Sequence, residues 1–380
     1  MKTADEEIID WLQLINSDNV GPVTFHKLLA KYKSAKEALG NLPSKCKRFP
    51  RELAVKEFDL CRSKGIRILT SNDSFYPKPL KNLEDAPPVL YALGNTEILH
   101  HPLSLSVVGA RNASINGRKL ASRIAYDLTE NEIVIVSGMA RGIDSAAHKG
   151  AMYALGQKGP TIAVLGTGVD VPYPAENTAL YHQIAEQGVI ISEFPLGTEP
   201  QANNFPRRNR LVAGLSLGTL VVEATLHSGS LITARLALEQ GKDIFAIPGS
   251  PNDARSQGPN KLIKDGAVLV ETSEDILHIL SMNNHRQIKS YTNKYKETPE
   301  QNLFSKAIDK PLKTDNIPVT ENIAATKSVR EYLSTSGTYV DEIIRNSGLD
   351  SATVSMELLE LEMNGIIERQ VGNKVALIKK

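Results

Sequence analysis

Four arginines stand where their side chains could bind phosphate groups: Arg111, Arg207, Arg208 and Arg210. Three of them, with Asn209 between two of them, share the short segment FPRRNRLVAGLS. A guanidinium group donates paired hydrogen bonds to a phosphate and also stacks on bases. Any one of these arginines could instead pair with Glu193 or Glu223, but two carboxylates do not neutralise four guanidinium groups. The set therefore predicts an anion-binding surface.

Loops rich in glycine and small polar residues follow the apolar runs that we expect to be strands. They are GARNASING (109–117), SGMARGID (137–144), GTGVDVPYP (166–174), SEFP (192–195), EATLHSGS (223–230) and PGSPNDARSQGPN (248–260). Glycine lets a backbone approach an anion closely, and a helix that starts there offers unpaired N–H groups. The loop residues that we predict to line an anion site are Ser137, Gly138, Gly142, Gly166, Gly168, Ser228 and Gly229.

The sequence argues against nucleotide cofactors and metals. It contains neither GxxxxGK[ST] nor a GxGxxG after the first strand, and Asp170 follows the pair Gly166 and Gly168, where its charge would repel a pyrophosphate. Cys46 and Cys61 have no further ligands at zinc-binding spacing. We therefore expect no cofactor and no metal.

The same sequence gives little support for catalysis. Ser137, Asp144, His148 and Glu223 could form a hydrolytic set only on paper, because no GxSxG elbow is present. Asp144 in the first turn of a helix is explained by the helix dipole. We expect a protein that is not an enzyme.

Alternating strands and helices must position these loops. Apolar runs that read as buried strands occur at 105–110, 133–138, 161–166 and 267–271 and in GVIISEF, GTLVVEA and KDIFAIP. Helical stretches separate them at 117–131, 143–155, 175–187, 206–216 and 230–240. This alternation predicts an α/β fold with an extended Rossmann-type, doubly wound parallel sheet, whose ligands bind outside the carboxyl ends of the strands.

Two smaller domains flank the predicted sheet. Residues 5–60 read as helices with a turn at Gly21-Pro22, which is either a phosphate-binding helix-hairpin-helix or a plain helical hairpin. The last fifty residues predict three short helices and a β-hairpin around Gly372-Asn373, as in a winged helix-turn-helix. The predicted domains are 1–68 (helical), 69–281 (sheet), 282–327 (flexible linker) and 328–380 (winged helix).

Composition sets only broad limits. The formal net charge is +1, so any positive surface that binds nucleic acid must be local. The acidic beginning, MKTADEEIIDW, does not read as a signal peptide, and no apolar run is long enough to span a bilayer. We expect a soluble, cytoplasmic protein.

Several motifs together resemble the DNA-processing protein A (DprA, also called Smf) family. In order they are VVGARNAS, SGMARGIDSAAHKGAM, TIAVLGTGVDVPYPAEN, ISEFPLG, FPRRNRLVAGLS, VVEATLHSGSLITARLALEQGKDIFAIPG and GPNKLIKDGA, within residues 70–280. The resemblance implies sequence-independent binding of single-stranded DNA and loading of a RecA-type recombinase during natural transformation. It also implies a homodimer, a further contact to a single-strand-binding protein, and no membrane contact.

The resemblance also implies which residues bind DNA. The family's Gly-x-Arg motif maps onto Gly109 and Arg111, and its FPxRNR motif maps onto Phe205, Pro206, Arg208, Asn209 and Arg210. Of these we predict Gly109, Arg111, Arg208, Asn209 and Arg210 to bind DNA, together with Lys242 and Lys261 in the last two motifs. Arg207 is added on charge alone. The YPxxN stretch (Tyr173, Pro174, Asn177) and the stretch 201–204 before Phe205 lack the basic residue that some members carry.

Two rival functions remain open. The segment GLSLGTLVVEA is faintly similar to the loop of nucleotide phosphoribohydrolases, with Glu223 in the catalytic place. The winged helix could also belong to a transcription factor, but its candidate recognition helix carries Asp350, Glu357, Glu360 and Glu362 and no basic residue. Phosphates would repel that helix, so we expect protein contacts there.

Overall fold

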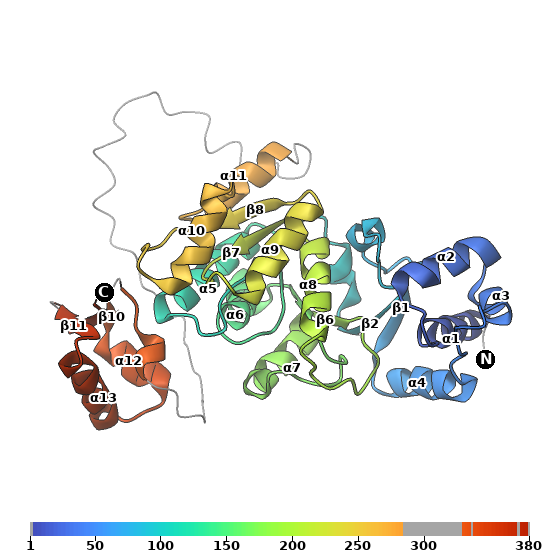
Figure 1. Ribbon diagram of the computed structural model, residues 1–380, viewed down its shortest axis with the longest axis horizontal. Helices are drawn as coiled ribbons and strands as arrows, with labels where there is room; N and C mark the ends of the chain where they lie inside the picture. Colours follow the sequence, from blue (N-terminus) through green and yellow to red (C-terminus); the bar gives the residue numbers. More distant parts are fainter. Residues whose placement is uncertain (1–2, 284–328, 336, 371–372, 379–380) are drawn as a thin grey trace. The chain divides into compact units, whose positions relative to one another are not determined.

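The computed structural model of the chain describes residues 3–283, 329–335, 337–370 and 373–378 (Figure 1). Those up to Glu271 belong to one unit, and those from Thr272 onward, except Ser334 and Thr335, belong to a second. The predicted linker over 282–327 lies outside the described residues from position 284 onward.

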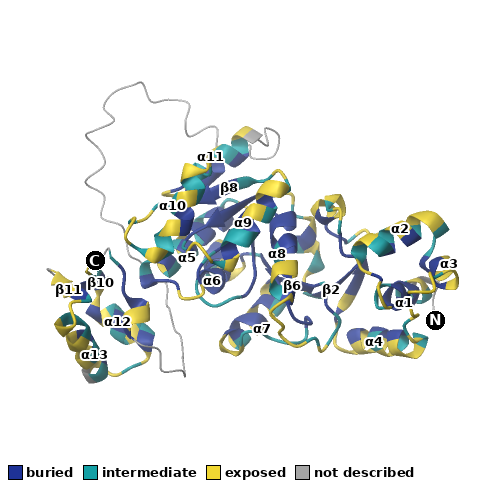
Figure 2. Cartoon of the chain, in the orientation of Figure 1, coloured by how far each residue is buried: buried dark blue, intermediate teal, exposed yellow. Residues whose placement is uncertain are grey.

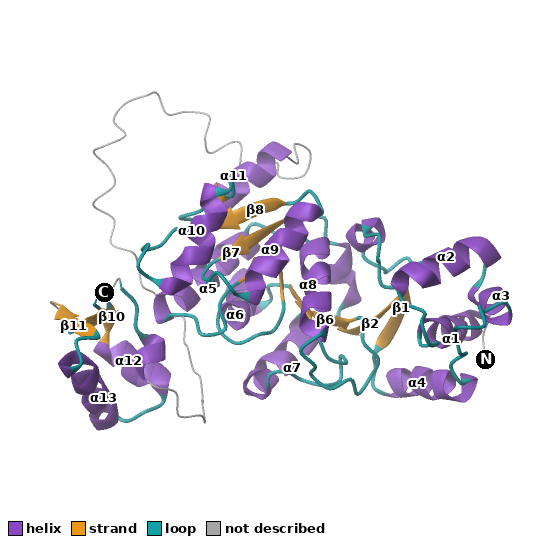
Figure 3. Cartoon of the chain, viewed as in Figure 1, coloured by secondary structure: helices purple, strands orange, loops and turns teal. Residues whose placement is uncertain are grey.

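The first unit is built on a sheet whose nine strands lie within residues 67–269, in the order β1-β2-β6-β5-β4-β3-β7-β8-β9. Figure 3 draws the strands in orange among the helices of this unit. The strands are β1 (Arg67–Thr70), β2 (Val89–Gly94), β3 (Ser104–Val108), β4 (Val134–Ser137), β5 (Thr161–Val164), β6 (Val189–Ser192), β7 (Gly218–Val221), β8 (Asp243–Ala246) and β9 (Val268–Leu269). Along the sheet from β6 through β5, β4, β3, β7 and β8 to β9, every pair of neighbouring strands is parallel. This confirms the predicted doubly wound sheet. Strands β1 and β2 were not predicted from the sequence, and they extend the sheet by antiparallel pairing.

Helices cover both faces of the sheet. They are α5 (Ile115–Glu130), α6 (Ile143–Gln157), α7 (Thr178–Gln187), α8 (Asn204–Leu215), α9 (Gly229–Glu239) and α10 (Gln257–Lys264), with short 3-10 helices at Lys78–Asn82, Thr96–His100, Ala175–Asn177 and Ala254–Ser256. The side chains of β5 alternate between two cores, because successive residues of a strand point to opposite faces. Ala163 packs in the core that includes α7, and Ile162 and Val164 pack in the core that includes α8 and α9.

The helical domain is not separated from the sheet by a break in packing. It comprises α1 (Thr3–Ile15), α2 (Pro22–Tyr32), α3 (Ala35–Gly40) and α4 (Arg51–Ser63), and Figure 2 shows buried residues running from these helices into the sheet. Trp11 and Phe25 lie 4.9 Å apart between ring centroids, in the same core as Tyr91 of β2. Glu57 of α4 accepts a hydrogen bond of 2.6 Å from the hydroxyl of Tyr91. The predicted boundary near residue 68 therefore divides one shared core.

The second unit contains the predicted winged helix. Its elements are α11 (Ser273–Asn283), a 3-10 helix (Val329–Tyr332), β10 (Thr338–Tyr339), α12 (Val340–Ser347), α13 (Ser351–Met363), β11 (Ile367–Gln370) and β12 (Lys374–Leu377). The last two strands pair antiparallel, as the predicted hairpin requires, although Gly372 in its turn lies outside the described residues. Gly348 ends α12 in a left-handed conformation, and Asp350 caps α13 by accepting from the backbone of Thr353.

Gly142 is required where the loop after β4 crosses the loop after β3. Its φ is +80°, and an added Cβ would lie 2.2 Å from the carbonyl oxygen of Ala110 and 2.6 Å from that of Arg111.

Gly142→Ala should therefore lower the free energy of unfolding by about 2 kcal/mol or more, measured by urea denaturation with circular dichroism. The control is Gly229→Ala, where nothing lies within 4 Å of an added Cβ, and its change should stay within about 0.5 kcal/mol. Equal stability of the two variants would contradict this packing.

Candidate nucleic-acid interface

The loops after the parallel strands meet at one edge of the sheet, which we call the rim: residues 109–114, 138–142, 165–174, 193–203, 222–228 and 247–256. The chain leaves β3 toward β4 on one side, and it leaves β7 toward β8 on the other. The strand order therefore reverses between β3 and β7, which is where ligands bind in open α/β sheets. The loop after β3 carries Arg111, so this arginine stands at the reversal point.

A cation and two aromatic rings lie in a row along the rim. The guanidinium carbon of exposed Arg111 is 5.5 Å from the ring centroid of Phe205, in the first turn of α8. The ring of Phe205 is in turn 5.4 Å from that of Tyr173, with an interplanar angle of 37°. Both rings are only partly buried. Gly166 lies beneath Phe205, since an added Cβ there would be 2.9 Å from the ring.

Arg208 is buried beneath this row instead of facing solvent. Its Nη1 donates to the carbonyl oxygen of Val164 at 2.6 Å, and only 6% of the residue is exposed. Burial lowers the pKa of Arg208 to about 10, with Asp144 opposing the shift and Arg111 adding to it. Arg208 thus stays protonated at neutral pH. The expectation that it holds a phosphate directly is not supported by this position.

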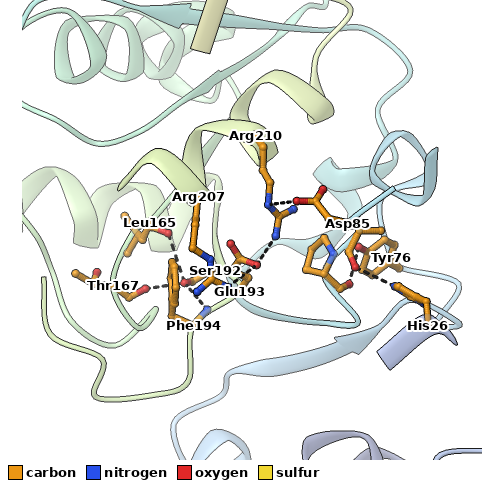
Figure 4. A network of polar contacts seen from close by, with 12 residues as sticks. His26, Tyr76, Asp85, Leu165, Thr167, Ser192, Glu193, Phe194, Arg207 and Arg210 are labelled. Atoms are coloured by element: carbon orange, nitrogen blue, oxygen red, sulfur yellow. Dashed lines mark hydrogen bonds and ion pairs between the residues drawn. The ribbon is translucent and has the colours of Figure 1, made fainter. Parts of the chain in front are cut away.

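Arg210 is likewise engaged inside the protein (Figure 4). Its guanidinium bridges Glu193, at 2.5 Å, and Asp85, at 3.1 Å, and its side chain is 10% exposed. Arg207, on the same helix, stays 54% exposed, 3.7 Å from Glu193 and 5.1 Å from the ring centroid of Phe194. The pairing with Glu193 that the sequence left open therefore occurs. It removes Arg210 from the surface and leaves Arg207 accessible.

Internal packing explains most of the glycines and serines predicted to line an anion site. The hydroxyl of Ser137 is buried and donates to the carbonyl of Val107 at 2.6 Å. A Cβ on Gly138 would meet the guanidinium of Arg208, and one on Gly168 would lie 2.7 Å from the carbonyl of Pro195. These positions are small because neighbouring atoms fill the space around them, as they do at Gly142 and Gly166.

At the start of α9 the predicted anion site stays open. Ser228 caps the helix by accepting from the backbone N–H of Ser230, and Gly229 is exposed with nothing within 4 Å of an added Cβ. The Nδ2 of Asn209 donates to the carbonyl oxygen of Gly229 at 3.3 Å, which joins α8 to this helix start. Gly109, which was predicted to bind DNA, is a glycine because of close packing: an added Cβ there would lie 2.5 Å from the side chain of Ile143.

The two predicted lysines do not join the rim. Lys242 directly precedes β8 and so lies at the amino ends of the strands, on the opposite edge of the sheet; burial lowers its pKa. Lys261 is an exposed residue of α10 that pairs with Asp265, four residues further along the helix, at 3.6 Å. The structure gathers Arg111, Arg207 and Asn209 near the rim and leaves Lys242 apart.

The residues of the rival hydrolytic sites have structural partners. The carboxylate of Glu223 accepts from the backbone N–H of Ser114 at 2.9 Å and from its hydroxyl at 2.6 Å, at the start of α5. Asp144 accepts from the backbone N–H of Gly138 at 3.1 Å, and His148 contacts the hydroxyl of Thr161 at 2.8 Å. These contacts hold the start of a helix and pair most of the buried polar groups, although Nε2 of His148 is left without a hydrogen-bond partner among the described residues.

The sequence analysis did not predict a role for either aromatic residue of the row. Tyr173 and Phe205 stand in recognised motifs, but their spacing of 32 positions says nothing about ring contact. The sequence signal that could have found them is an aromatic residue in a glycine-rich loop after one strand and another at the start of a helix after the next.

Comparison with known proteins settles the family. A family profile described as "DNA recombination-mediator protein A" matches residues 67–281, which is more than half of the chain. Profiles described as "DprA-like N-terminal HHH domain" and "DprA winged helix domain" match residues 5–66 and 318–373. The chain belongs to the DNA recombination-mediator protein A (DprA/Smf) family.

Relatives agree with this DprA/Smf assignment over most of the chain. Protein Smf of Escherichia coli (strain K12) is 38% identical over 331 residues, which cover 87% of this chain and 82% of that protein. DNA processing protein DprA of Streptococcus pneumoniae is 47% identical over 205 residues, covering 54% of this chain and 71% of that protein.

Solved DprA structures share the fold. The X-ray structure of DprA from Streptococcus pneumoniae superposes with a TM-score of 0.61 at 36% identity, covering 73% of this chain and 98% of that one. DprA from Helicobacter pylori, whose structure is reported for its single-stranded DNA binding mode, gives a TM-score of 0.52 at 31% identity, covering 57% and 96%.

The described part of this DprA/Smf chain holds neither a metal-binding cluster nor a membrane helix. No three His, Cys, Asp or Glu side chains gather there as a metal site. None of its helices has the length and apolar character needed to cross a membrane.

Below the rim, His148 should make stability sensitive to acid. Burial lowers its pKa to about 3, whereas an unfolded histidine titrates near 6.5. Protonation therefore favours the unfolded state, and the stabilising effect of neutral His148 is lost as the pH falls below about 6.5. Between pH 7.5 and 5.5 the free energy of unfolding of the wild type should fall by about 1 kcal/mol more than that of His148→Gln, measured by urea denaturation. His227→Gln, at an exposed position, should behave like the wild type. An identical pH dependence of His148→Gln and the wild type would refute this assignment.

Proposed function

We propose that the chain binds single-stranded DNA without sequence preference at the rim. The observation that carries this proposal is the row formed by Arg111, Phe205 and Tyr173, in which Arg111 stands at the point where the strand order reverses. Half-buried rings are held rigidly enough to receive an unstacked base, and every base has a π face, so stacking does not depend on sequence. Arg111 is exposed beside them and can hold the neighbouring phosphate through two hydrogen bonds.

Single strands suit this surface better than duplex does. Bases inside a duplex are already stacked on one another, so two aromatic rings side by side gain a partner only when the strand is unpaired. The single-stranded DNA binding mode reported for the Helicobacter pylori relative supports the same choice. The family match supports a role in DNA processing.

The arginines of α8 take different parts in this proposal. Arg207 is exposed and adds positive charge near the row. Arg208 and Arg210 position α8 from below, because each is buried against partners of its own. Asn209 and Gly229 offer an open helix start where a further phosphate would meet backbone N–H groups. Lys261, an exposed residue of α10, stays a predicted DNA contact outside the rim.

The recombination step is a further part of the proposal. We propose that the bound strand is passed to a RecA-type recombinase during natural transformation, in the cytoplasm, by a homodimer that also meets a single-strand-binding protein. The family description "recombination-mediator" supports it. We propose that the winged helix contributes protein contacts, because its helix α13 carries acidic residues and no basic one. Lack of enzymatic activity stays a prediction.

Removing either part of the row should weaken binding of single-stranded DNA. At 0.1 M salt, Arg111→Ala should raise Kd about tenfold for all sequences and flatten the log–log salt dependence by about 0.7, because one phosphate is no longer neutralised. Arg111→Lys should recover part of the affinity, since it keeps the charge but not the paired donors. Phe205→Ala should cost about 1–3 kcal/mol with an unchanged salt slope, because a ring contributes stacking and no charge.

The matched control is Arg235→Ala, an exposed arginine of α9 that is paired with Glu239. It removes the same charge away from the row and should leave Kd within about twofold, measured by fluorescence anisotropy with a labelled oligonucleotide. An equal loss in Arg111→Ala and Arg235→Ala would contradict the proposal.

Recombinase loading can be tested separately. On single-stranded DNA covered by single-strand-binding protein, the wild-type chain should shorten the lag of RecA filament growth, and Arg111→Ala should lose this effect in proportion to its loss of DNA affinity. The readout is RecA ATP hydrolysis, which reports filament length. Strong DNA binding without any shortening of the lag would leave the DNA site intact and refute the mediator role.

A further inference from the structure

The helical domain carries a local positive charge that the net charge of +1 conceals. Residues 19–49 contain six lysines and one arginine but a single acidic residue, Glu37. Four of the lysines lie on two consecutive helices and in the turn between them, and define what we call the lysine surface: Lys27, Lys31, Lys33 and Lys36. All four are exposed. Within the described residues none of the four makes an ion pair.

Helix geometry brings these lysines together. Lys27 and Lys31 are four residues apart on α2 and so share one face of that helix. Lys33 ends α2 in a left-handed conformation, with φ of 68°, and Lys36 follows in the first turn of α3. Figure 1 shows α2 and α3 as neighbours at the end of the helical domain. The four lysines therefore lie on two neighbouring helices and the turn that joins them.

Basic residues also come from a third segment. The backbone carbonyl of Lys47 accepts from the N–H of Asp18 at 3.0 Å, and that of Lys45 accepts from the side chain of Asn19, also at 3.0 Å. These bonds hold the segment 45–48 against the turn that precedes α2. The exposed side chains of Lys45 and Lys47 thus widen the positive region on the side of the α1–α2 turn.

Cations on other exposed helices of the first unit form ion pairs along the helix. On α5, α9 and α10 the cations Arg123, Arg235 and Lys261 each pair with an acidic residue four positions later. On α2 the residue four positions after Lys27 is another lysine. Like charges at this spacing cost a helix about 0.2–0.5 kcal/mol, whereas opposite charges stabilise it. Lys119 and Arg123 of α5 have the same like-charge spacing, but Arg123 is also paired with Asp127. On the lysine surface neither Lys27 nor Lys31 has an ion pair among the described residues, and a bound polyanion would relieve their repulsion.

The chemistry of the lysine surface differs from that of the rim. Phe25 is fully buried in the core, and the ring of Tyr32 is partly buried with the Nζ of Lys31 5.0 Å from its centroid. No exposed aromatic side chain stands among residues 19–49 to receive a base. Lysine binds phosphate as a point charge and reads no sequence. The ligand must therefore be recognised by the density of its negative charge.

We infer that the lysine surface binds the phosphate backbone of duplex DNA. A duplex carries one negative charge per about 1.7 Å of its axis, twice the density of either strand, and its bases need no stacking partner. Its rigid phosphate rows also match lysines fixed on two packed helices. The inference does not rest on the single-strand site at the rim, and together the two sites would suit a DNA molecule that has both a duplex and a single-stranded part.

The test compares two variants of the full chain that lose the same charge. The first is Lys27→Gln/Lys31→Gln/Lys33→Gln/Lys36→Gln. The control is Lys56→Gln/Lys78→Gln/Lys158→Gln/Lys264→Gln, at four exposed lysines elsewhere in the first unit, none of them in an ion pair among the described residues. Binding of a blunt 20-base-pair duplex and of a 20-nucleotide single strand is measured by anisotropy from 0.05 to 0.3 M salt, and thermal unfolding checks that both variants fold.

At 0.1 M salt the first variant should bind the duplex at least about tenfold more weakly, with a log–log salt slope that is smaller by about 0.9 for each phosphate that is no longer neutralised. Its affinity for the single strand should change less than threefold. The control should change both affinities by less than threefold. Equal losses in the two variants, or a duplex affinity that the first variant retains, would overturn the inference. Loss of single-strand binding in Arg111→Ala with duplex binding intact would leave it standing.

A lysine footprint separates DNA from an acidic protein as the ligand. The wild-type chain is treated with a limiting amount of an amine-reactive acetylating reagent under three conditions: alone, with the duplex, and with poly-glutamate of equal total charge. The acetylated lysines are then quantified by mass spectrometry. The duplex should protect Lys27, Lys31, Lys33 and Lys36 several-fold more than poly-glutamate does, and Lys158 should stay unprotected. Protection by poly-glutamate but not by duplex would assign the surface to an acidic protein and refute the inference.

Discussion

The guanidinium group of Arg208 is enclosed where three elements meet. It donates to the carbonyl at the end of β5, occupies the space that a Cβ on Gly138 would fill after β4, and interacts with Asp144 in the first turn of α6. A buried charge is tolerated only when such partners surround it, so α8 cannot slide or rotate without losing them. Phe205 lies three residues before Arg208, one turn nearer the start of the helix. The same contacts therefore decide where its ring lies relative to Tyr173 and Arg111.

The shared core extends this constraint into the helical domain. Trp11, Phe25 and Phe58 belong to one cluster with Tyr91 of β2 and Leu165 directly after β5. Lys64 at the end of α4 pairs with Asp170 in the rim at 2.8 Å. Two surfaces of different chemistry, the rim and the lysine surface, are thus carried by a single packed body. Substitutions in the helical domain can therefore alter the rim, and those in the sheet can alter the lysine surface.

Charge is distributed unevenly along a chain that is almost neutral overall. The stretch 19–49 is strongly basic, whereas residues 329–378 of the winged-helix region contain four basic and eight acidic residues. Near the rim the balance is finer, because Glu193 and Asp85 neutralise Arg210 and leave Arg111 and Arg207 accessible. Affinity for DNA depends on which cations are accessible, since buried pairs release no counterions.

The sequence by itself determined the order of the elements, the parallel core from β3 to β9, the winged helix and the family. These features follow from hydrophobic periodicity and from motifs, both of which are local. Only the tertiary structure decided that β1 and β2 extend the sheet, that Tyr173 meets Phe205, and that most of the glycines serve close packing. It also separated the arginines of FPRRNR. Successive residues of a helix point about 100° apart, so Arg207 faces solvent, Arg208 enters the strand ends, and Arg210 reaches two carboxylates on another segment. The direction of each side chain is set by what packs against its helix, and that is decided by residues far away in the sequence.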